Sequence, residues 1–326
     1  MSELSPNPEN KKTDGVTAAC RRNPPTMKFK QRFRQLRDAT LFGLAFLGTG
    51  LLALLPAVLV DAGAQRAGRL AYRWSGRRGA QLRANLRVVA ASSAGSPPVE
   101  SLASDVYANY GRYMVEFFTM HWPDLWGRRK RMVVEEGPLQ RAKDAGRGVV
   151  LFGIHGGNWD MAASECARRY GAFHSAGESV EPAWLGRLIN RVRRGGHTQL
   201  YDSMSAARPL LRALRRGEII GLVADRVVAG PGVEARLCGR MALLPAGPVW
   251  LALKNGAPLL PTMIERKPDG RVHIEFWDAI DLHGLSDDEA GIVLGVQRMA
   301  DALTQMIQQG HASWFALQPV WPDVRP

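Results

Sequence analysis

The stretch GVVLFGIHGGNWDMAA, from Gly148 to Ala163, decides the fold expected of this sequence. Its first seven residues form a short apolar run typical of a buried strand. The two glycines that follow His155 allow a tight loop, and Asn158 is a natural N-cap for a helix that we predict over 158–169. A strand, a loop and a helix in this order predict one unit of an α/β fold.

The same alternation continues on both sides of this stretch. Upstream, apolar residues at helical spacing predict a helix over 102–120. Downstream, the patterns predict a helix over 205–216, a buried strand over 218–224, a helix over 245–254, a hairpin of 259–265 with 272–277, and a long helix from a capping box at Ser286 and Glu289 to Gln309. We therefore predict an α/β fold with a mixed central sheet flanked by helices.

The first 64 residues differ in composition from the rest. Residues 1–36 are polar and become basic toward their end, which predicts a disordered basic tail. The segment 37–64 holds the apolar run Ala39–Val60, 22 residues without a charge. Residues 65–326 are then the globular domain.

The apolar run is long enough to cross a bilayer as a helix. Both of its flanks are basic, however, so that neither side has the charge expected of an outer face. Pro56 and three glycines within the run also disfavour a straight helix. We interpret the run as a membrane-embedded or interfacial helix on an anionic membrane surface; a true span and a buried core helix stay open.

The chain carries 43 basic against 30 acidic side chains, a net charge of +13. Of the basic residues 35 are Arg, whose planar fork suits phosphate, so a nucleic acid, an anionic lipid or a phosphorylated carrier fits as a partner. A GC-rich coding sequence would produce the same excess. The three cysteines, Cys20, Cys166 and Cys238, contain no CxxC pair, which disfavours a disulfide framework or a structural zinc site and favours a reducing compartment.

His155 is the first candidate for chemistry, because ligand sites in open α/β sheets lie beyond the carboxyl ends of strands. Asp160 follows five positions later. On one continuous helix such positions lie about 140° apart, so the two side chains meet only if His155 lies in the loop. The alternative is a loop histidine beside a carboxylate that complements the helix dipole.

Asp225 and Arg226 end the second buried strand. If the two strands are neighbours, this carboxylate and guanidinium can orient an imidazole or bind a phosphate. A surface ion pair is the alternative. Farther upstream, Arg187, Arg191 and Arg194 are spaced to form one basic stripe on a helix. The stripe suits a phosphate-bearing head group, a carrier or a membrane surface, and a solvated face is its alternative.

Several classes of protein lose support. The chain contains no GxSxG, GxxxxGK[ST] or HExxH motif and no GxGxxG after a strand, which disfavours serine hydrolases, P-loop NTPases, zincins and Rossmann dehydrogenases. Aromatic residues are not interleaved with the arginine stripe, so a nucleic-acid partner is not expected. The class that remains is a membrane-attached α/β protein with a histidine base supported by a carboxylate.

These residues resemble a family. An H-x4-D element (HX4D motif) after a buried strand is the signature of glycerolipid and lysophospholipid acyltransferases. The chain looks like the bacterial branch that contains lipid A late acyltransferases and phosphatidylinositol mannoside acyltransferases. The resemblance runs from about residue 65 to the end, through the segments Arg69–Val89, His155–Ala163, Val223–Glu265 and Trp314–Asp323.

The resemblance implies an acyltransferase domain over 65–326 that moves a fatty acyl chain from acyl-CoA or acyl carrier protein to a hydroxyl of a glycolipid or phospholipid. It implies no metal and no other cofactor, and a site at the cytoplasmic side of the inner membrane. His155 is then the general base. Asp160 and Asp225 both match acidic residues of the family, and which of them holds the imidazole is left open. Asn158, Arg226 and the stripe of Arg187, Arg191 and Arg194 are the expected substrate contacts.

Two other functions are compatible with the same residues. A lipid-binding protein without catalysis would keep the scaffold but not need His155. A thioesterase or lipase would use His155 to activate water. For the acyltransferase, the acyl pocket is expected to be apolar and to end near the run 39–60.

Overall fold

The computed structural model describes residues 25–93, 95–127, 132–178, 180–228, 230, 232–267 and 269–326, with side chains from residue 35 onward. Residues 1–24, which include Cys20 and most of the predicted tail, lie outside the described residues. The remaining part of the predicted tail, residues 25–36, belongs to a helix, so the prediction of disorder is wrong there. The helix that contains them continues without a break into the apolar run, to Leu54.

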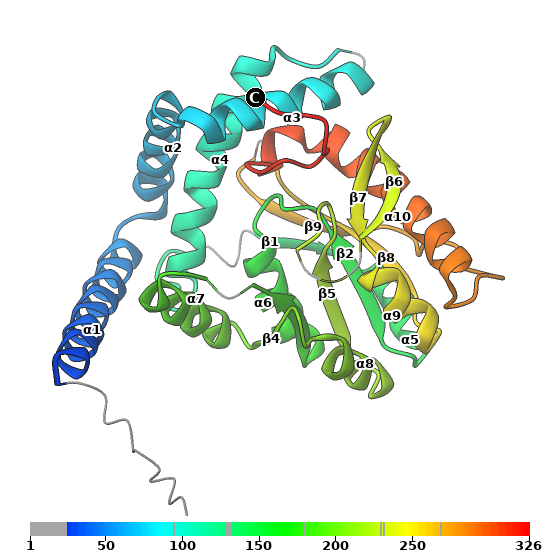
Figure 1. The fold of residues 1–326 in the computed structure, drawn as a ribbon, viewed down its shortest axis with the longest axis horizontal. Coiled ribbons are helices and arrows are strands. Elements are labelled where there is room, and N and C mark those ends of the chain that lie inside the picture. The colour runs from blue at the N-terminus through cyan, green and yellow to red at the C-terminus, as the bar shows by residue number, and fades with distance from the viewer. Residues whose placement is uncertain are drawn as a thin grey trace, which may run out of the picture.

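The chain begins with helices and then alternates strands and helices (Figure 1). The helical part consists of α1 (Pro25–Leu54), α2 (Ala57–Arg73), α3 (Gly76–Ser92) and α4 (Val99–Thr119). The strands are β1 (Met132–Glu135), β2 (Val149–Gly153), β3 (Phe173–Gly177), β4 (Thr198–Asp202), β5 (Ile219–Val223), β6 (Gly232–Leu237), β7 (Arg240–Pro245), β8 (Leu259–Arg266) and β9 (Val272–Phe276). The helices among them are α5 (Gly137–Asp144), α6 (Trp159–Tyr170), α7 (Ala183–Gly195), α8 (Ala207–Arg215), α9 (Gly247–Asn255) and α10 (Glu289–Gln309), and a 3-10 turn, η2, covers His311–Ser313.

Seven strands form one mixed sheet in the order β1-β9-β8-β2-β5-β3-β4. The strands from β8 to β4 run parallel, whereas β9 and β1 run the opposite way because β8 and β9 form a hairpin. The predicted α/β fold with a mixed sheet is therefore confirmed. The separate antiparallel ribbon of β6 and β7 was not predicted.

Strands β2 and β5 are direct neighbours in this sheet. Val149 pairs with Ile219 and Gly153 with Val223, so both strands end at the same level. Four of the five residues of β2 are buried, as are the first two of β5, whereas the last three of β5 are half-buried. The residues that follow the two strands are thereby brought to one edge of the sheet.

The start of the last long helix differs from its prediction. The N-cap is Asp288, whose side chain accepts a hydrogen bond from the Gly291 N–H at 2.8 Å. Ser286 instead donates its hydroxyl to Asp288 at 2.6 Å, so the expected capping box of Ser286 and Glu289 does not form. A carboxylate caps more favourably because its charge also complements the helix dipole. The predicted end at Gln309 is confirmed.

Helices α1 and α2 are two separate helices, divided at Pro56. The second packs along α4 at very short range: a Cβ on Gly68 would come within 2.2 Å of the Tyr107 carbonyl oxygen, so only glycine fits there. In α1, Gln35–Leu54 is long and apolar enough to cross a membrane by length and composition. Only 11% of that stretch is buried, so it is not a buried core helix.

The last residues of the chain return to α3 (Figure 1). Asn85 is fully buried and donates its amide to the carbonyl oxygens of Ala316 and Gln318 at 2.9 and 2.7 Å. Gln81, one turn earlier, donates to the Val324 carbonyl oxygen. Two polar side chains of a helix thus hold the closing segment in place, because buried amides need such partners.

Candidate active site

His155 lies in the loop between β2 and α6. The loop is tight because Gly157 has a φ of +62° and because a Cβ there would come within 2.1 Å of the Ile264 carbonyl oxygen. Helix α6 begins directly after it, with Asn158 as the N-cap, accepting from the Met161 N–H at 3.0 Å. The imidazole is thereby held at the carboxyl end of β2, with 20% of its side chain exposed.

Asp225 follows the neighbouring strand β5 and contacts this imidazole directly. Its Oδ1 lies 2.6 Å from His155 Nδ1, and its Oδ2 accepts the His155 backbone N–H at 3.1 Å. The carboxylate therefore binds the same residue twice, once at the ring and once at the backbone. With Nδ1 held in this way, Nε2 is the nitrogen left for a substrate.

Trp314 completes the surroundings of Asp225. Its indole N–H donates to Asp225 Oδ2 at 2.7 Å, and the side chain is fully buried. Burial by itself raises the pKa of the Asp225 carboxyl, but the charge of His155 and the hydrogen bonds from His155 and Trp314 outweigh it and hold that pKa below its ordinary value. Asp225 is thus kept as a carboxylate beside the imidazole.

The segment that carries Trp314 also braces the His155 loop. The Phe315 N–H donates to the His155 carbonyl oxygen at 2.7 Å, and the Gly157 N–H donates to the Ser313 carbonyl oxygen at 3.1 Å. A Cβ on Gly156 would come within 2.9 Å of that same Ser313 oxygen. Gly156 and Gly157 therefore allow the His155 loop to pack closely against the backbone at Ser313, which is remote in sequence.

Asp160 does not contact the imidazole. It lies in the first turn of α6 and binds Arg193 of α7 at 2.8 Å and the hydroxyl of Tyr113 at 2.8 Å. Burial and the Asp160 charge raise the pKa of Tyr113 well above its usual value, so the phenol stays a donor. Burial lowers the pKa of Arg193, but Asp160 raises it by more. Of the two candidate carboxylates, Asp225 is the one that holds His155.

Asn158 is committed to the protein interior. Besides capping α6, it donates its amide to Glu116 of α4 at 2.9 Å, and only 3% of the residue is exposed. Glu116 in turn pairs with Arg266 of β8. This chain of contacts fixes the start of α6, and Asn158 does not line the cavity described next.

A cavity of about 690 Å³ opens beside His155. Its lining comes mainly from the strands β2, β3, β4, β5, β8 and β9 and from the helices α6, α8 and α9. Gly153, Gly221 and Gly177 lie on three neighbouring strands that line it. The side chains that line it are mainly apolar, such as Leu151, Phe173, Leu200, Leu210, Trp250 and Ile274.

Arg226 and the α7 arginines are placed differently. Arg226 lines the cavity and lies 4.0 Å from Glu178. Arg187, Arg191 and Arg194 share the exposed side of α7, as the spacing predicted, but they do not line the cavity. Arg191 stacks over the ring of Phe46 of α1 at 4.8 Å. The stripe therefore lies beside the apolar helix, away from the imidazole.

The expected end of the pocket near the run 39–60 is wrong for this cavity. Its lining residues lie between Leu151 and Ile292, and no described residue of α1 or α2 is among them. The cavity instead lies along the sheet strands β2, β5 and β3 and their neighbours. Ala53 of α1 does line a second, much smaller pocket of about 30 Å³ on the other side of α6.

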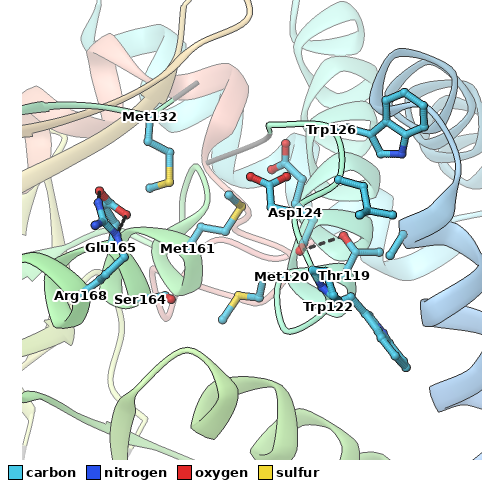
Figure 2. A pocket seen from close by; sticks show the side chains of 14 residues that line it. Thr119, Met120, Trp122, Asp124, Trp126, Met132, Met161, Ser164, Glu165 and Arg168 are labelled. Carbon is cyan, nitrogen blue, oxygen red and sulfur yellow. Dashed lines mark hydrogen bonds and ion pairs between the residues drawn. The ribbon is translucent and has the colours of Figure 1, made fainter. Parts of the chain in front are cut away.

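Figure 2 shows this smaller pocket, with the sulfur-bearing side chains of Met120, Met132 and Met161 inside it and Glu165 and Arg168 at one border. Its volume has room for about one water molecule. Met161 points into this pocket, whereas the preceding Asp160 lines the large cavity. The first turn of α6 thus lies between the two cavities.

Sequence reasoning missed two residues of the site. The residue type of Trp314 could have indicated a polar contact, because a buried tryptophan usually needs a hydrogen-bond partner for its N–H group. The spacing of Arg193 could have indicated one as well: it lies about 240° around the helix from Arg187 and so does not belong to the exposed stripe. Neither signal names the partner, since Asp225 and Asp160 come from other elements.

The arrangement has the parts of a general-base site. A neutral imidazole with Nδ1 bound to a carboxylate presents Nε2 as a proton acceptor. The adjoining cavity is apolar and long enough to take a hydrocarbon chain. A hydroxyl compound placed between them would be activated beside the chain.

Comparison with known proteins identifies a family and several relatives. The family described as bacterial lipid A biosynthesis acyltransferase matches residues 26–322. A phosphatidylinositol mannoside acyltransferase of Mycobacterium tuberculosis (strain CDC 1551 / Oshkosh) is 34% identical over 251 residues, 74% of this chain and 76% of that protein. The protein of the same name from Mycolicibacterium smegmatis (strain ATCC 700084 / mc(2)155) is 33% identical over 254 residues, 74% of this chain and 79% of that protein.

Proposed function

We propose a mechanism for a chain that belongs to the bacterial lipid A biosynthesis acyltransferase family and is, by that membership, an acyltransferase of glycolipid biosynthesis. In this mechanism a fatty acyl chain is transferred from a thioester donor to a glycolipid hydroxyl, and His155 is the general base that takes the proton of that hydroxyl. The observation that carries the proposal is the 2.6 Å contact of His155 Nδ1 with Asp225 at the wall of the large cavity.

The reaction balances with these residues alone. Nε2 of His155 takes the proton of the acceptor hydroxyl while its oxygen attacks the thioester carbonyl carbon. The carbonyl oxygen becomes an oxyanion in the tetrahedral intermediate. When the intermediate collapses, the carbon–sulfur bond breaks, an ester remains, and the imidazolium returns its proton to the leaving thiolate.

Asp225 orients the base rather than accepting the proton. It holds the tautomer with the proton on Nδ1 and stabilises the imidazolium that forms, as the carboxylate of a catalytic triad does. The indole N–H of Trp314 keeps this carboxylate charged and in place. Asp160 has a structural role in this proposal, because Arg193 and Tyr113 occupy its oxygens.

The oxyanion needs hydrogen-bond donors near the carbonyl. In the His155 loop the backbone N–H groups of His155, Gly156 and Gly157 already donate to other groups. The first turn of α6, which follows directly, has N–H groups that no intrahelical acceptor can satisfy. These are the backbone donors that we assign to the oxyanion.

The large cavity is the proposed acyl site. Its apolar walls suit a saturated chain, and each buried methylene contributes roughly 0.8 kcal/mol, so cavity length selects chain length. The donor is acyl-CoA or acylated acyl carrier protein, since both present the same phosphopantetheine thioester.

The acceptor is proposed to be a phosphatidylinositol mannoside or a related glycolipid. The names of the two mycobacterial relatives support this substrate over a lipid A precursor. Arg226 is the guanidinium at the cavity that we assign to a phosphate group of the substrate. This ligand would displace the long 4.0 Å contact with Glu178.

The exposed apolar face of α1 supports attachment to the inner membrane with the active site on the cytoplasmic side. Leu44, Leu47 and Leu51 are each more than 60% exposed. The arginine stripe of α7 lies beside this face, where anionic head groups would bind at about 1 kcal/mol per charge. Arg187, Arg191 and Arg194 are thus proposed as membrane contacts of the enzyme.

His155→Ala tests the proposal. We expect a folded, membrane-bound protein whose acyl transfer falls by about 10²–10⁴-fold, the usual contribution of a general base. The assay follows acylation of a phosphatidylinositol mannoside extract by palmitoyl-CoA or palmitoyl acyl carrier protein, whichever the wild-type protein turns over. His283→Ala is the matched control, because His283 is exposed in a loop before α10.

Other outcomes would replace the proposal. Full transfer activity in His155→Ala removes the mechanism. Donor consumption by the wild-type protein without an acylated lipid identifies a thioesterase. Binding of acyl chains without turnover of either donor identifies a lipid-binding protein on the same scaffold.

A further inference from the structure

Thr262 carries a buried hydroxyl with no internal partner. The residue is 9% exposed, and within the described part of the chain its Oγ1 forms no hydrogen bond. Buried side-chain oxygens are nearly always hydrogen-bonded in folded proteins. A hydroxyl that is left without a partner by the protein itself points to a ligand that supplies one.

The position of Thr262 in the sheet brings it close to the reacting end of the cavity. Strand β8 pairs with β2 in parallel, with Pro261 opposite Phe152, so that Thr262 is level with Gly153. A Cβ on Gly153 would lie only 2.9 Å from the Thr262 carbonyl oxygen. Gly153 precedes His155 by two residues, a rise of about 6–7 Å along a strand.

Thr262 and Gly153 both line the large cavity together with His155. Because Gly153 has no side chain, nothing on β2 covers the cavity at the level of Thr262. The next residue of β8 on the same face is Ile264, whose carbonyl oxygen lies under Gly157 of the His155 loop. Thr262 thus lies on the floor below the imidazole loop.

The wall around this hydroxyl is apolar. Ile264 and its cross-strand partner Ile274 line the cavity on one side of it, and Leu151 lines it on the β2 side. A cavity for a hydrocarbon chain gains nothing from a hydroxyl in such a wall, because a polar group without a partner is unfavourable there. The hydroxyl is explained if the bound molecule has an acceptor at this depth.

A saturated fatty acyl group has a single hydrogen-bond acceptor, its carbonyl oxygen. We propose that the Thr262 hydroxyl donates a hydrogen bond to the acyl carbonyl oxygen of the thioester donor. This inference rests on the proposed function, since it assumes that the cavity binds the acyl chain. Thr262 transfers no proton: its O–H stays intact while the carbonyl oxygen gains charge as the acceptor oxygen attacks.

The proposal predicts a kinetic effect of one hydroxyl group. The contact strengthens as the oxygen becomes an oxyanion, so Thr262 acts mainly on kcat rather than on the KM for the donor. Removal of an oxyanion donor typically lowers kcat by about 10²–10³-fold. Thr262→Val keeps the shape of the side chain and removes the O–H, whereas Thr262→Ser keeps the O–H.

The experiment measures three quantities for both variants in the full chain. They are kcat and KM for transfer, the rate of donor hydrolysis without acceptor, and the midpoint of urea unfolding. The donor is whichever of palmitoyl-CoA and palmitoyl acyl carrier protein the wild-type protein turns over. We expect Thr262→Val to lose transfer and hydrolysis by the same factor, since both pass through an oxyanion on the same atom.

Thr262→Ser is expected to keep most of the activity, and Thr262→Val to unfold at the same or a higher urea concentration than the wild type. Unchanged kcat in Thr262→Val overturns the proposal, as does an effect on KM alone. Equal losses in both variants, or a loss that follows lowered stability, assign Thr262 to packing and also overturn it. A failure of the proposed function can be distinguished from a failure of this inference, because the activity of His155→Ala tests the proposed function by itself.

Discussion

The two carboxylates near the imidazole loop are both buried, yet they have opposite uses. Asp225 binds the ring of His155 and the indole of Trp314, whereas Asp160 binds Arg193 and Tyr113. Asp160 is five residues from His155 in sequence, and Asp225 is seventy. The comparison teaches that the neighbouring strand, not the nearer position in the sequence, supplies the partner of the imidazole, because β2 and β5 end side by side.

Their electrostatic surroundings differ as well. Asp225 faces a group that changes its charge during the proposed reaction, with a neutral indole as its other donor. Asp160 faces the guanidinium of Arg193 and the phenol of Tyr113, whose pKa values are both raised, and neither group takes part in the proposed proton transfer. The first carboxylate is suited to support proton transfer, and the second is suited to join α6, α7 and α4.

Asp225→Asn gives the largest expected effect on activity. The amide oxygen can replace Oδ2 toward Trp314 and the His155 N–H, which turns the NH₂ group toward His155 Nδ1. Nδ1 then accepts a hydrogen bond, and the ring proton moves to Nε2, where no substrate proton can be taken. We expect kcat to fall by about 10⁴-fold, as in a triad with the wrong tautomer. Steady-state acyl transfer measures it; a fall below tenfold would contradict the assignment.

Asp160→Asn has its main effect on stability. It leaves Arg193, whose side chain is 19% exposed, without its charged partner. Breaking a buried ion pair on one side costs about 3–5 kcal/mol of unfolding free energy. Urea unfolding measures the loss, and the double variant Asp160→Asn with Arg193→Met should recover part of it. If Asp160→Asn instead keeps full stability and loses activity like Asp225→Asn, the contrast between the two carboxylates is wrong.

Of the three variants, Trp314→Phe has the smallest expected effect. Its test is the pH dependence of the free energy of unfolding. The lost hydrogen bond to a charged group is worth about 1.5–3 kcal/mol. Because the pKa of Asp225 is lowered on folding, its contribution to stability is present above about pH 4, the unfolded value, and is lost as the pH falls through the folded pKa. Trp314→Phe removes one cause of the lowering, so the contribution is smaller and its loss is complete at a higher pH.

Thermal unfolding of Trp314→Phe between about pH 3 and pH 6 checks this shift. Trp321→Phe is the matched control. Its indole is equally buried but donates to the Leu237 carbonyl oxygen at 3.2 Å, so no titrating group is involved. The same acid shift in both variants would show that the hydrogen bond of Trp314 to Asp225 is not its cause.

The parts of the fold that the sequence predicted are those with a strong local pattern. β2 and β5 are uninterrupted apolar runs, and α4 and α10 have long apolar stripes. β3 and β4 were not predicted, because FHSAG and TQLYD mix polar and apolar residues without a period. Their strand form depends on pairing with each other and with β5, which is a tertiary interaction.

In the candidate site, too, some residues follow from a local sequence pattern, whereas others depend on tertiary contacts. His155, Asp225 and Arg226 were recognised because each follows a buried strand and precedes a loop. Asn158 was recognised as an N-cap, but its second contact with Glu116 comes from a helix 42 residues earlier. Trp314 approaches Asp225 from the end of the chain, and no spacing along the sequence indicates that contact.

The sequence by itself predicted an imidazole at the end of a strand in an α/β fold with an apolar N-terminal segment, since local periodicity and short motifs carry that information. The acyltransferase function was implied by the resemblance to a family. Only the tertiary structure decided which carboxylate holds the imidazole, where the large cavity runs and which arginine faces inward. The reason is physical: hydrogen-bond partners and cavities are formed by strands that are adjacent in space, and their order in the sheet is not their order in the chain.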